Sequence, residues 1–170
     1  MNYKFFGAVC VIAACGGFGF LMAAQHMQRI HLLRELISAL DYMECELQYR
    51  STALPELCFQ TAQQSRGKIK VLLQFLSEEL EAQISPNVSL CIAIALERCG
   101  ELPDVIKNMC GYLGNSLGKF DLMGQLKGLD ETRLVCRNQL ETLLRNKDIR
   151  THSYQTLGLC AGAAIAILFV

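Results

Sequence analysis

The sequence has no excess of either charge, because 16 Lys and Arg residues balance 16 Asp and Glu residues. Proteins that bind nucleic acid usually carry a basic excess, so this balance removes the general electrostatic reason to do so. The chain also lacks any run in which apolar and polar residues alternate, and it lacks a low-complexity linker. These absences argue against β-strands and against a division of the central region into separate domains.

Motifs for metal binding or catalysis are also missing. No Cys-x-x-Cys pair occurs, and His26 and His31, five residues apart, do not share a helical face. Six central cysteines, irregularly spaced and mostly among apolar neighbours, are predicted to be unpaired thiols in a reducing compartment, although their even number leaves disulfides in an exported domain open. They are Cys45, Cys58, Cys91, Cys99, Cys110 and Cys136. We expect no cofactor, no metal and no enzymatic activity.

What the sequence does have is two uncharged apolar ends, at 5–24 and 154–170. Twenty helical residues span roughly 30 Å, the thickness of a bilayer core, and the second run is at the short end of the spanning range. We therefore expect an N-terminal membrane anchor helix at 1–24, an all-helical domain at 25–153, and a C-terminal transmembrane helix at 154–170.

The first apolar segment has a second interpretation. Residues 12–15 resemble a bacterial lipoprotein cleavage box, which would leave a lipid on Cys15. The apolar run continues for nine residues beyond that position, which favours an uncleaved anchor. An exported, membrane-tethered or lipid-anchored helical domain that binds a partner remains the alternative.

Basic residues beside the two apolar segments indicate the topology. Lys4 alone lies outside the two segments. Five basic residues lie between them, at the two ends of the central domain: Arg29, Arg34, Arg145, Lys147 and Arg150. By the positive-inside rule, the domain is predicted to be cytoplasmic and both termini to lie across the membrane.

The central domain shows helical periodicity throughout. Apolar residues recur at intervals of three and four, and Pro, Gly and short polar turns separate the repeats. The predicted helices cover about 26–50, 54–64, 68–83, 87–99, 103–117 and 122–148. The fold class is therefore an all-α bundle of about six helices between two membrane helices.

One glycine-rich stretch, "GNSLGKF" at 114–120, resembles a phosphate-binding loop. Its first glycine is one residue too close to Gly118, Phe120 stands where Ser or Thr is needed, and no strand precedes it. The stretch is better explained as a turn between helices, in which Gly118 ends one helix, Phe120 packs back as a staple and Asp121 caps the next helix.

The same turn carries a resemblance to a known family. "LGNSLGKFDLMGQLKGL" resembles the Leu-Gly-x-Thr/Ser-Leu-Gly-x-x-Asp-x-x-x-Gln signature of stage III sporulation protein AB, through Gly114, Gly118, Asp121 and Gln125. A second segment at 44–54 is similar to that family's Glu-x-Glu-Ile-x-Tyr-x-x-Thr-Pro-Leu motif, through Glu44, Glu46, Tyr49, Thr52 and Leu54. The tail is similar through Gly158 and Gly162. Ala53 and Phe120 depart from the family pattern, and residues 58–110 carry no signature.

The resemblance implies a function without chemistry of its own. The family is similar to inner-membrane platform proteins of type II secretion and type IV pilus systems. It implies a component of the mother cell–forespore channel of endospore formation, in the mother-cell membrane facing the forespore. The implied partners are the cytoplasmic ATPase stage III sporulation protein AA, other channel membrane components and the lipid bilayer. Homo-oligomerisation stays open.

Two hypotheses name residues. Glu44 and Arg133 occupy corresponding positions on the seams of the two long helices, about nineteen residues from the membrane ends, and are predicted to form a partly buried pair that fixes register. Two separate solvated charges are the alternative. Glu46 and Tyr49 share a helical face, and we predict that they help bind the ATPase, whereas Asp121 contributes mainly to stability.

Overall fold

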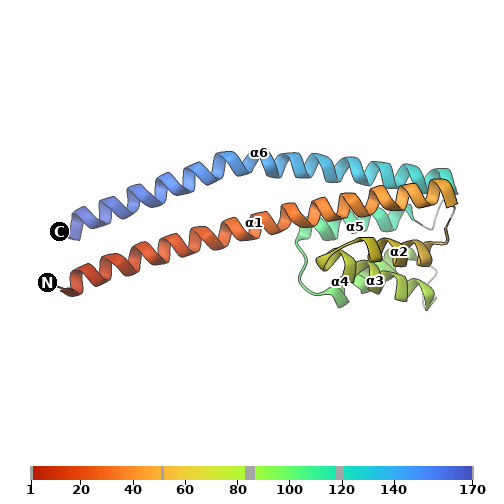
Figure 1. Ribbon diagram of the computed structural model, residues 1–170, viewed down its shortest axis with the longest axis horizontal. Helices are drawn as coiled ribbons and strands as arrows, with labels where there is room; N and C mark the ends of the chain where they lie inside the picture. The colour runs from red at the N-terminus through yellow and green to blue at the C-terminus, as the bar shows by residue number, and fades with distance from the viewer. Residues whose placement is uncertain (1, 51, 83–86, 118–120, 170) are drawn as a thin grey trace. The chain divides into compact units, whose positions relative to one another are not determined.

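The computed structural model describes the backbone of residues 2–50, 52–82, 87–117 and 121–169, and side-chain surroundings within 24–145 apart from the same gaps. Over these residues all regular secondary structure is helical, with no strand. The six helices are α1 (Asn2–Arg50), α2 (Leu54–Gln64), α3 (Gly67–Glu81), α4 (Val88–Cys99), α5 (Asp104–Ser116) and α6 (Leu122–Phe169) (Figure 1). The all-α class predicted from the sequence is confirmed.

The two long helices differ from the sequence-based boundaries. The segments predicted at 5–24 and 26–50 form one helix of 49 residues, and α6 continues for 48 residues without a break near position 148. Neither junction contains a proline, and the polar residues at each junction are compatible with a continuing helix. Over the residues whose side chains are described, no helix is both long enough and apolar enough to cross a membrane. The predicted spans lie almost entirely outside those residues, as does Cys15.

The chain forms two compact units, and their boundaries fall inside the long helices. One unit comprises Met1–Ile30 with Glu141–Val170, and the other comprises His31–Leu140. In the first unit, His26 Nε2 lies 3.2 Å from the backbone oxygen of Leu143, which brings α1 and α6 together. The second unit contains the four short helices and the adjoining parts of α1 and α6.

Local sequence signals place the ends of the short helices. Pro55 lies in the first turn of α2, where its missing amide hydrogen costs nothing. Gly67 (φ 57°) precedes the body of α3, and Gly100 (φ 80°) ends α4, so both occupy the left-handed region that favours glycine. The Asn87 side chain caps α4 by accepting a hydrogen bond of 3.1 Å from Ser89 N. The predicted end of α3 was slightly too late, because the helix stops at Glu81.

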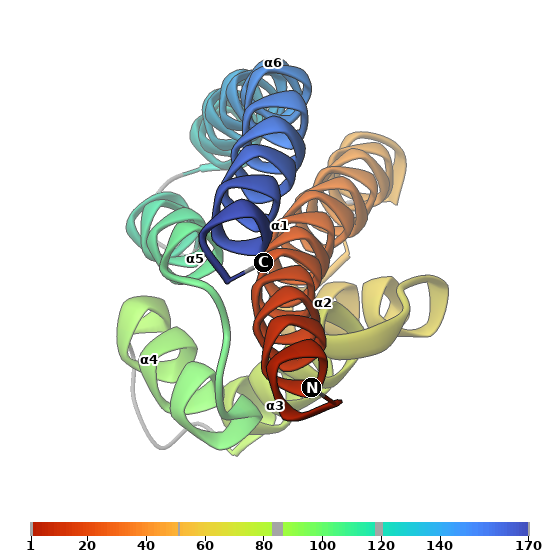
Figure 2. The ribbon, with the colours of Figure 1, turned by 90° about the vertical axis from the view of Figure 1, so that its left-hand side faces the viewer.

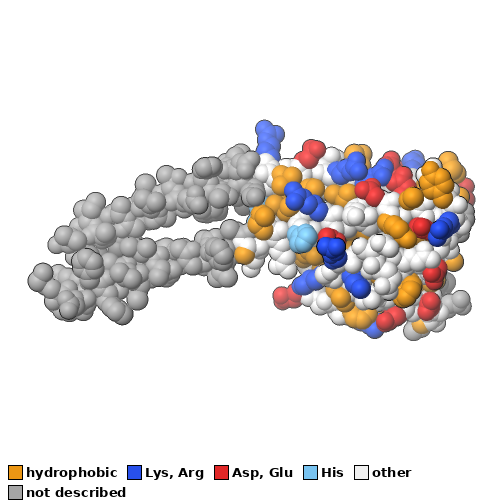
Figure 3. Space-filling model, in the orientation of Figure 1, with side chains coloured by type: hydrophobic (Ala, Val, Ile, Leu, Met, Phe, Trp, Pro, Cys, Tyr) orange, Lys and Arg blue, Asp and Glu red, His pale blue; other side chains and the backbone are white. Residues whose placement is uncertain are grey.

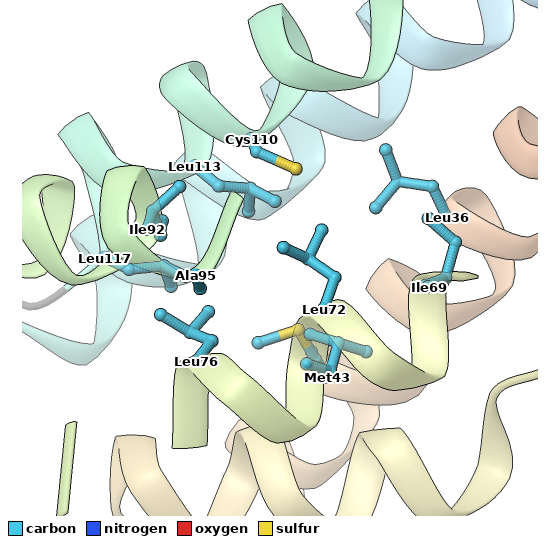
Figure 4. A pocket seen from close by; sticks show the side chains of 11 residues that line it. Leu36, Met43, Ile69, Leu72, Leu76, Ile92, Ala95, Cys110, Leu113 and Leu117 are labelled. Carbon is cyan, nitrogen blue, oxygen red and sulfur yellow. The ribbon is translucent and has the colours of Figure 1, made fainter. Parts of the chain in front are cut away.

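The short helices pack in chain order: α2 on α3, α3 on α4 and α4 on α5. Figure 2 shows them following one another around an arc. Their apolar faces form a core with the adjoining part of α1, in which Leu33, Leu57 and Ile106 are fully buried. Within this core, a cavity of about 30 Å³ lies where α1, α3, α4 and α5 meet (Figure 4). Its lining is apolar, so it offers neither the room nor the polar groups that a ligand requires.

Candidate functional site

The structure separates the two residues predicted to form a docking spot. On α1, the Tyr49 side chain is 79% exposed. The Glu46 side chain is only 13% exposed, and its Oε2 lies 3.7 Å from Arg50 Nη1, one turn along the same helix. Tyr49 is therefore available to a partner, whereas Glu46 is largely covered by the protein.

Glu46 belongs to a local cluster at the end of α1. Burial, followed by the charge and hydrogen bond of Glu46, raises the pKa of the Tyr42 hydroxyl above its ordinary value. Glu46 Oε2 is nevertheless buried without a hydrogen-bond partner among the described residues. The signature residues that follow, Thr52 and Leu54, are half-buried around the turn into α2. This arrangement orders the helix end from which Tyr49 projects.

Arg133 on α6 lies against Glu44 on α1, as the register hypothesis predicted, but the contact is larger than a pair. Arg133 also bonds Asp41 at 3.1 Å and Asp130 on its own helix, and Arg137 lies 3.8 Å from Asp41. Partial burial disfavours the charge of Arg133, but hydrogen bonds to Asp130 and Asp41 outweigh this and raise its pKa. The Arg133 side chain is 23% exposed, so the network is neither fully buried nor a free surface pair.

Asp121 is placed at the N-terminus of α6. Its Oδ1 accepts a hydrogen bond of 3.0 Å from Gly124 N, which is the geometry of a helix cap. Its backbone oxygen accepts from the amide of Gln125 at 2.9 Å. Gly118 and Phe120, which were predicted to complete this turn, lie outside the described residues, and so do the surroundings of Gly158 and Gly162 in the tail. Asp121 thus has a structural role that needs no partner.

Two glycines allow close contacts between helices. A Cβ at Gly114 on α5 would lie 2.9 Å from the backbone Cα of Ser89 on α4. Ser89 Oγ donates to the Gly114 carbonyl oxygen at 2.6 Å, so the two helices are joined by a hydrogen bond where they approach. On α6, a Cβ at Gly128 would overlap the Ser116 side chain at the end of α5. Gly114 and Gly128 are therefore determinants of helix packing.

The sequence interpretation missed Ser89, Ser116 and Gly128. Gly128 lies within the quoted signature segment, seven residues after Asp121. A glycine inside a strongly periodic helix usually has a packing reason, and that signal could have identified Gly128. Nothing in the spacing indicates that its neighbour is Ser116.

All six described cysteines are free thiols. Burial raises the pKa of Cys58 to about 12 and that of Cys136 to about 11, and burial followed by the nearby Cys136 and Cys99 raises that of Cys110 to about 12. Thiols with such pKa values carry little thiolate at neutral pH and are weak nucleophiles. Cys45 on α1 is the exposed member of the set.

Within the described part of the chain, no group of His, Cys, Asp and Glu side chains could hold a metal ion. Figure 3 shows Lys and Arg side chains interspersed with Asp and Glu over the visible face, with apolar side chains between them. The features that the structure does present are packing contacts, the α1–α6 charge network and individual exposed side chains such as Tyr49.

The sequence matches the stage III sporulation protein AB family over residues 4–170. The chain belongs to this family. A solved structure titled "Stage III sporulation protein AB (SpoIIIAB)" is similar in fold, with a TM-score of 0.64 and 21% sequence identity, over 72% of this chain and 98% of that one. No curated protein matches the sequence.

Membership of the stage III sporulation protein AB family supports a role in sporulation. The matched range includes all three segments that resemble the family: the Glu46–Tyr49 segment, the Asp121 turn and the tail. In this structure, Gly114 and Asp121 have direct packing or capping explanations. Tyr49 has none, and its side chain is exposed to solvent.

Proposed function

We propose that this chain is a membrane platform or adaptor of the mother cell–forespore channel, which links a cytoplasmic ATPase to the membrane complex. The observation that carries the proposal is the family match over 4–170. The uncharged ends of α1 and α6 support it, because each is in the length range of a bilayer span. The helical domain between them has no group that could hold a metal ion among its described residues, which fits an assembly role.

Membrane insertion can be tested on the full chain. We expect the protein to float with vesicles after alkaline carbonate extraction, because two apolar helices cannot be stripped as a peripheral contact can. Intact-mass measurement of the extracted protein should show the complete N-terminus and an unmodified Cys15. A protein released by carbonate, or one that lacks its first fourteen residues and carries a diacylglyceryl group, contradicts the two-span proposal.

The topology can be tested with Cys45, because its thiol is exposed while four of the other described thiols are buried. In intact cells, a membrane-permeant maleimide should label Cys45 and an impermeant one should not. A Cys45→Ser chain identifies any signal that arises from cysteines in the terminal segments. Labelling of Cys45 by the impermeant reagent would favour an exported, membrane-tethered domain instead.

We further propose that Tyr49 contacts the ATPase, stage III sporulation protein AA, and that Glu46 holds the end of α1 in place for that contact. Exposed tyrosines are enriched among the residues that dominate protein interfaces. Truncation of such a residue costs about 1–2 kcal/mol or more of binding energy, which is a loss of roughly five- to thirtyfold in affinity.

The experiment is a pull-down of the ATPase by the full chain in detergent, with a thermal melt of each variant. Tyr49→Ala should bind less and melt like the parent, whereas Asp121→Ala should lose about 1 kcal/mol of stability through its cap and still bind. Tyr112→Ala is a matched control, because Tyr112 on α5 is also exposed, at 55%. If Tyr49→Ala binds like the parent, the contact surface must be sought on α2 to α5.

A further inference from the structure

The charges of the chain are balanced in total but not along its length. Segments 25–34 and 145–153, which adjoin the apolar ends, contain five Lys or Arg residues and one Asp. Residues 35–144 contain ten Lys or Arg residues against fifteen Asp or Glu. The basic residues are therefore concentrated beside the apolar segments, and the rest of the domain is acidic.

The structure brings part of this basic region together within one compact unit. The contact between His26 Nε2 and the Leu143 carbonyl oxygen sets α1 beside α6. Arg29 lies three residues from His26, and Arg145 lies two residues from Leu143, so both are within one helical turn of the contact. Both side chains are exposed, and neither forms an ion pair with another described residue.

Helical rise sets the height of these charges above the apolar segments. Arg29 follows residue 24 by five positions and Arg150 precedes residue 154 by four, which is a rise of roughly 6–8 Å. The headgroup layer of a bilayer extends about 5–8 Å beyond each side of the hydrocarbon core. Lys147 and Arg145 lie farther from the apolar segment, at a rise of roughly 10–14 Å, which is beyond the Debye length of about 8–10 Å.

From this placement we infer that the basic ends of α1 and α6 bind anionic phospholipid headgroups, with Arg29 and Arg150 at the level of the phosphates. The inference rests on the proposed membrane insertion of the two helices. Arg145 and Lys147 add a weaker attraction from above the headgroup layer.

The test is a titration of the full chain, held in neutral detergent, with phosphatidylglycerol or with phosphatidylcholine of the same acyl chains. Bound lipid is counted by native mass spectrometry. We expect phosphatidylglycerol to bind more tightly, and we expect Arg29→Gln and Arg150→Gln each to weaken its binding about fivefold. Arg66→Gln removes the same charge from an exposed position before α3 and should leave lipid binding unchanged.

Three outcomes overturn the inference: equal binding of the two lipids, retained phosphatidylglycerol binding in the Arg29→Gln/Arg150→Gln double variant, or an equal loss in Arg66→Gln. A further measurement adds inorganic phosphate, or chloride at the same ionic strength, to the lipid-bound chain. Displacement of the lipid by phosphate beyond the effect of chloride would assign the site to a free anion. A chain that resists carbonate extraction but does not distinguish the lipids refutes this inference alone, whereas a chain that carbonate releases refutes the proposed function.

Discussion

α6 contacts the rest of the domain through two faces, which are held by different kinds of interaction. Toward the domain interior, Leu129, Thr132 and Cys136 are buried, and Gly128 has no side chain where α5 approaches. Toward α1, Arg133 reaches three carboxylates through a long, partly exposed side chain. One face therefore depends on shape and the other on charge.

The difference predicts how each face tolerates change. A close-packed contact has no space for an added atom, and its neighbours move only at a cost in free energy. A partly solvated charge network can rearrange, and water replaces a lost partner, so each of its members contributes less. Substitutions on the packed face should therefore cost more than substitutions on the charged face.

The largest expected effect is at the glycine contacts. Gly128→Ala and Gly114→Ala should each lower the free energy of unfolding by about 2–3 kcal/mol, because the new Cβ meets Ser116 or the backbone of Ser89. Denaturant unfolding measures the loss. Removing the opposing side chain with Ser116→Gly should partly restore the stability of the Gly128→Ala variant, as a double-mutant cycle would show.

Gly111 on α5 is the matched control for this prediction. A Cβ there meets nothing within 4 Å, so Gly111→Ala should stabilise the helix by about 0.5–1 kcal/mol. If Gly128→Ala and Gly111→Ala change stability equally, helix propensity rather than close packing governs both positions.

A smaller loss is expected on the charged face. Arg133→Met leaves Asp41, Glu44 and Asp130 close together without their shared cation. We expect a loss of about 1–2 kcal/mol, between the values for exposed and buried pairs. The loss should shrink in high salt, which screens the repulsion among the carboxylates. A loss that does not depend on salt would show that Arg133 acts through packing instead.

The smallest effect per residue concerns the buried thiols. Burial raises the folded-state pKa of Cys110 and Cys58 to about 12, from 9.0. Since the raised pKa belongs to the folded state, the stabilisation is fully present below pH 9 and declines as the pH rises toward 12. Each buried thiol should therefore lower the free energy of unfolding by roughly 1 kcal/mol as the pH rises from 8 to 10. Stability measured in Cys110→Ala should fall less steeply over this range, and an unchanged slope would contradict the burial.

Much of the fold could be predicted from the sequence, because helical periodicity and breakers such as Pro55 and Gly100 are local signals. The continuity of α1 and α6 could not, because an apolar segment shows no period that would distinguish an ending helix from a continuing one. The Glu44–Arg133 contact followed from counting positions along two antiparallel helices. Asp41 and Asp130, each three residues from a member of that pair, lay on the same helical faces and were overlooked.

The candidate site was harder to predict for a physical reason. Helical spacing puts Glu46 and Tyr49 on one helical face, but the exposure of each side chain depends on which other helices cover it. Glu46 is mostly covered and Tyr49 is not. Gly128 illustrates the same limit, because its importance lies in Ser116, which a helical pattern does not relate to it.

The glycine contacts also constrain how this chain can drift in evolution. An apolar core position accepts several side chains of similar volume, so repeated substitution there can leave a fold recognisable at 21% identity. Gly114 has no such set of tolerated replacements, since the Cβ of alanine, the smallest possible substitution, would already meet the backbone of α4. As the sequence diverges, substitutions should therefore accumulate at the leucines and valines of the core, whereas Gly114 should stay unchanged.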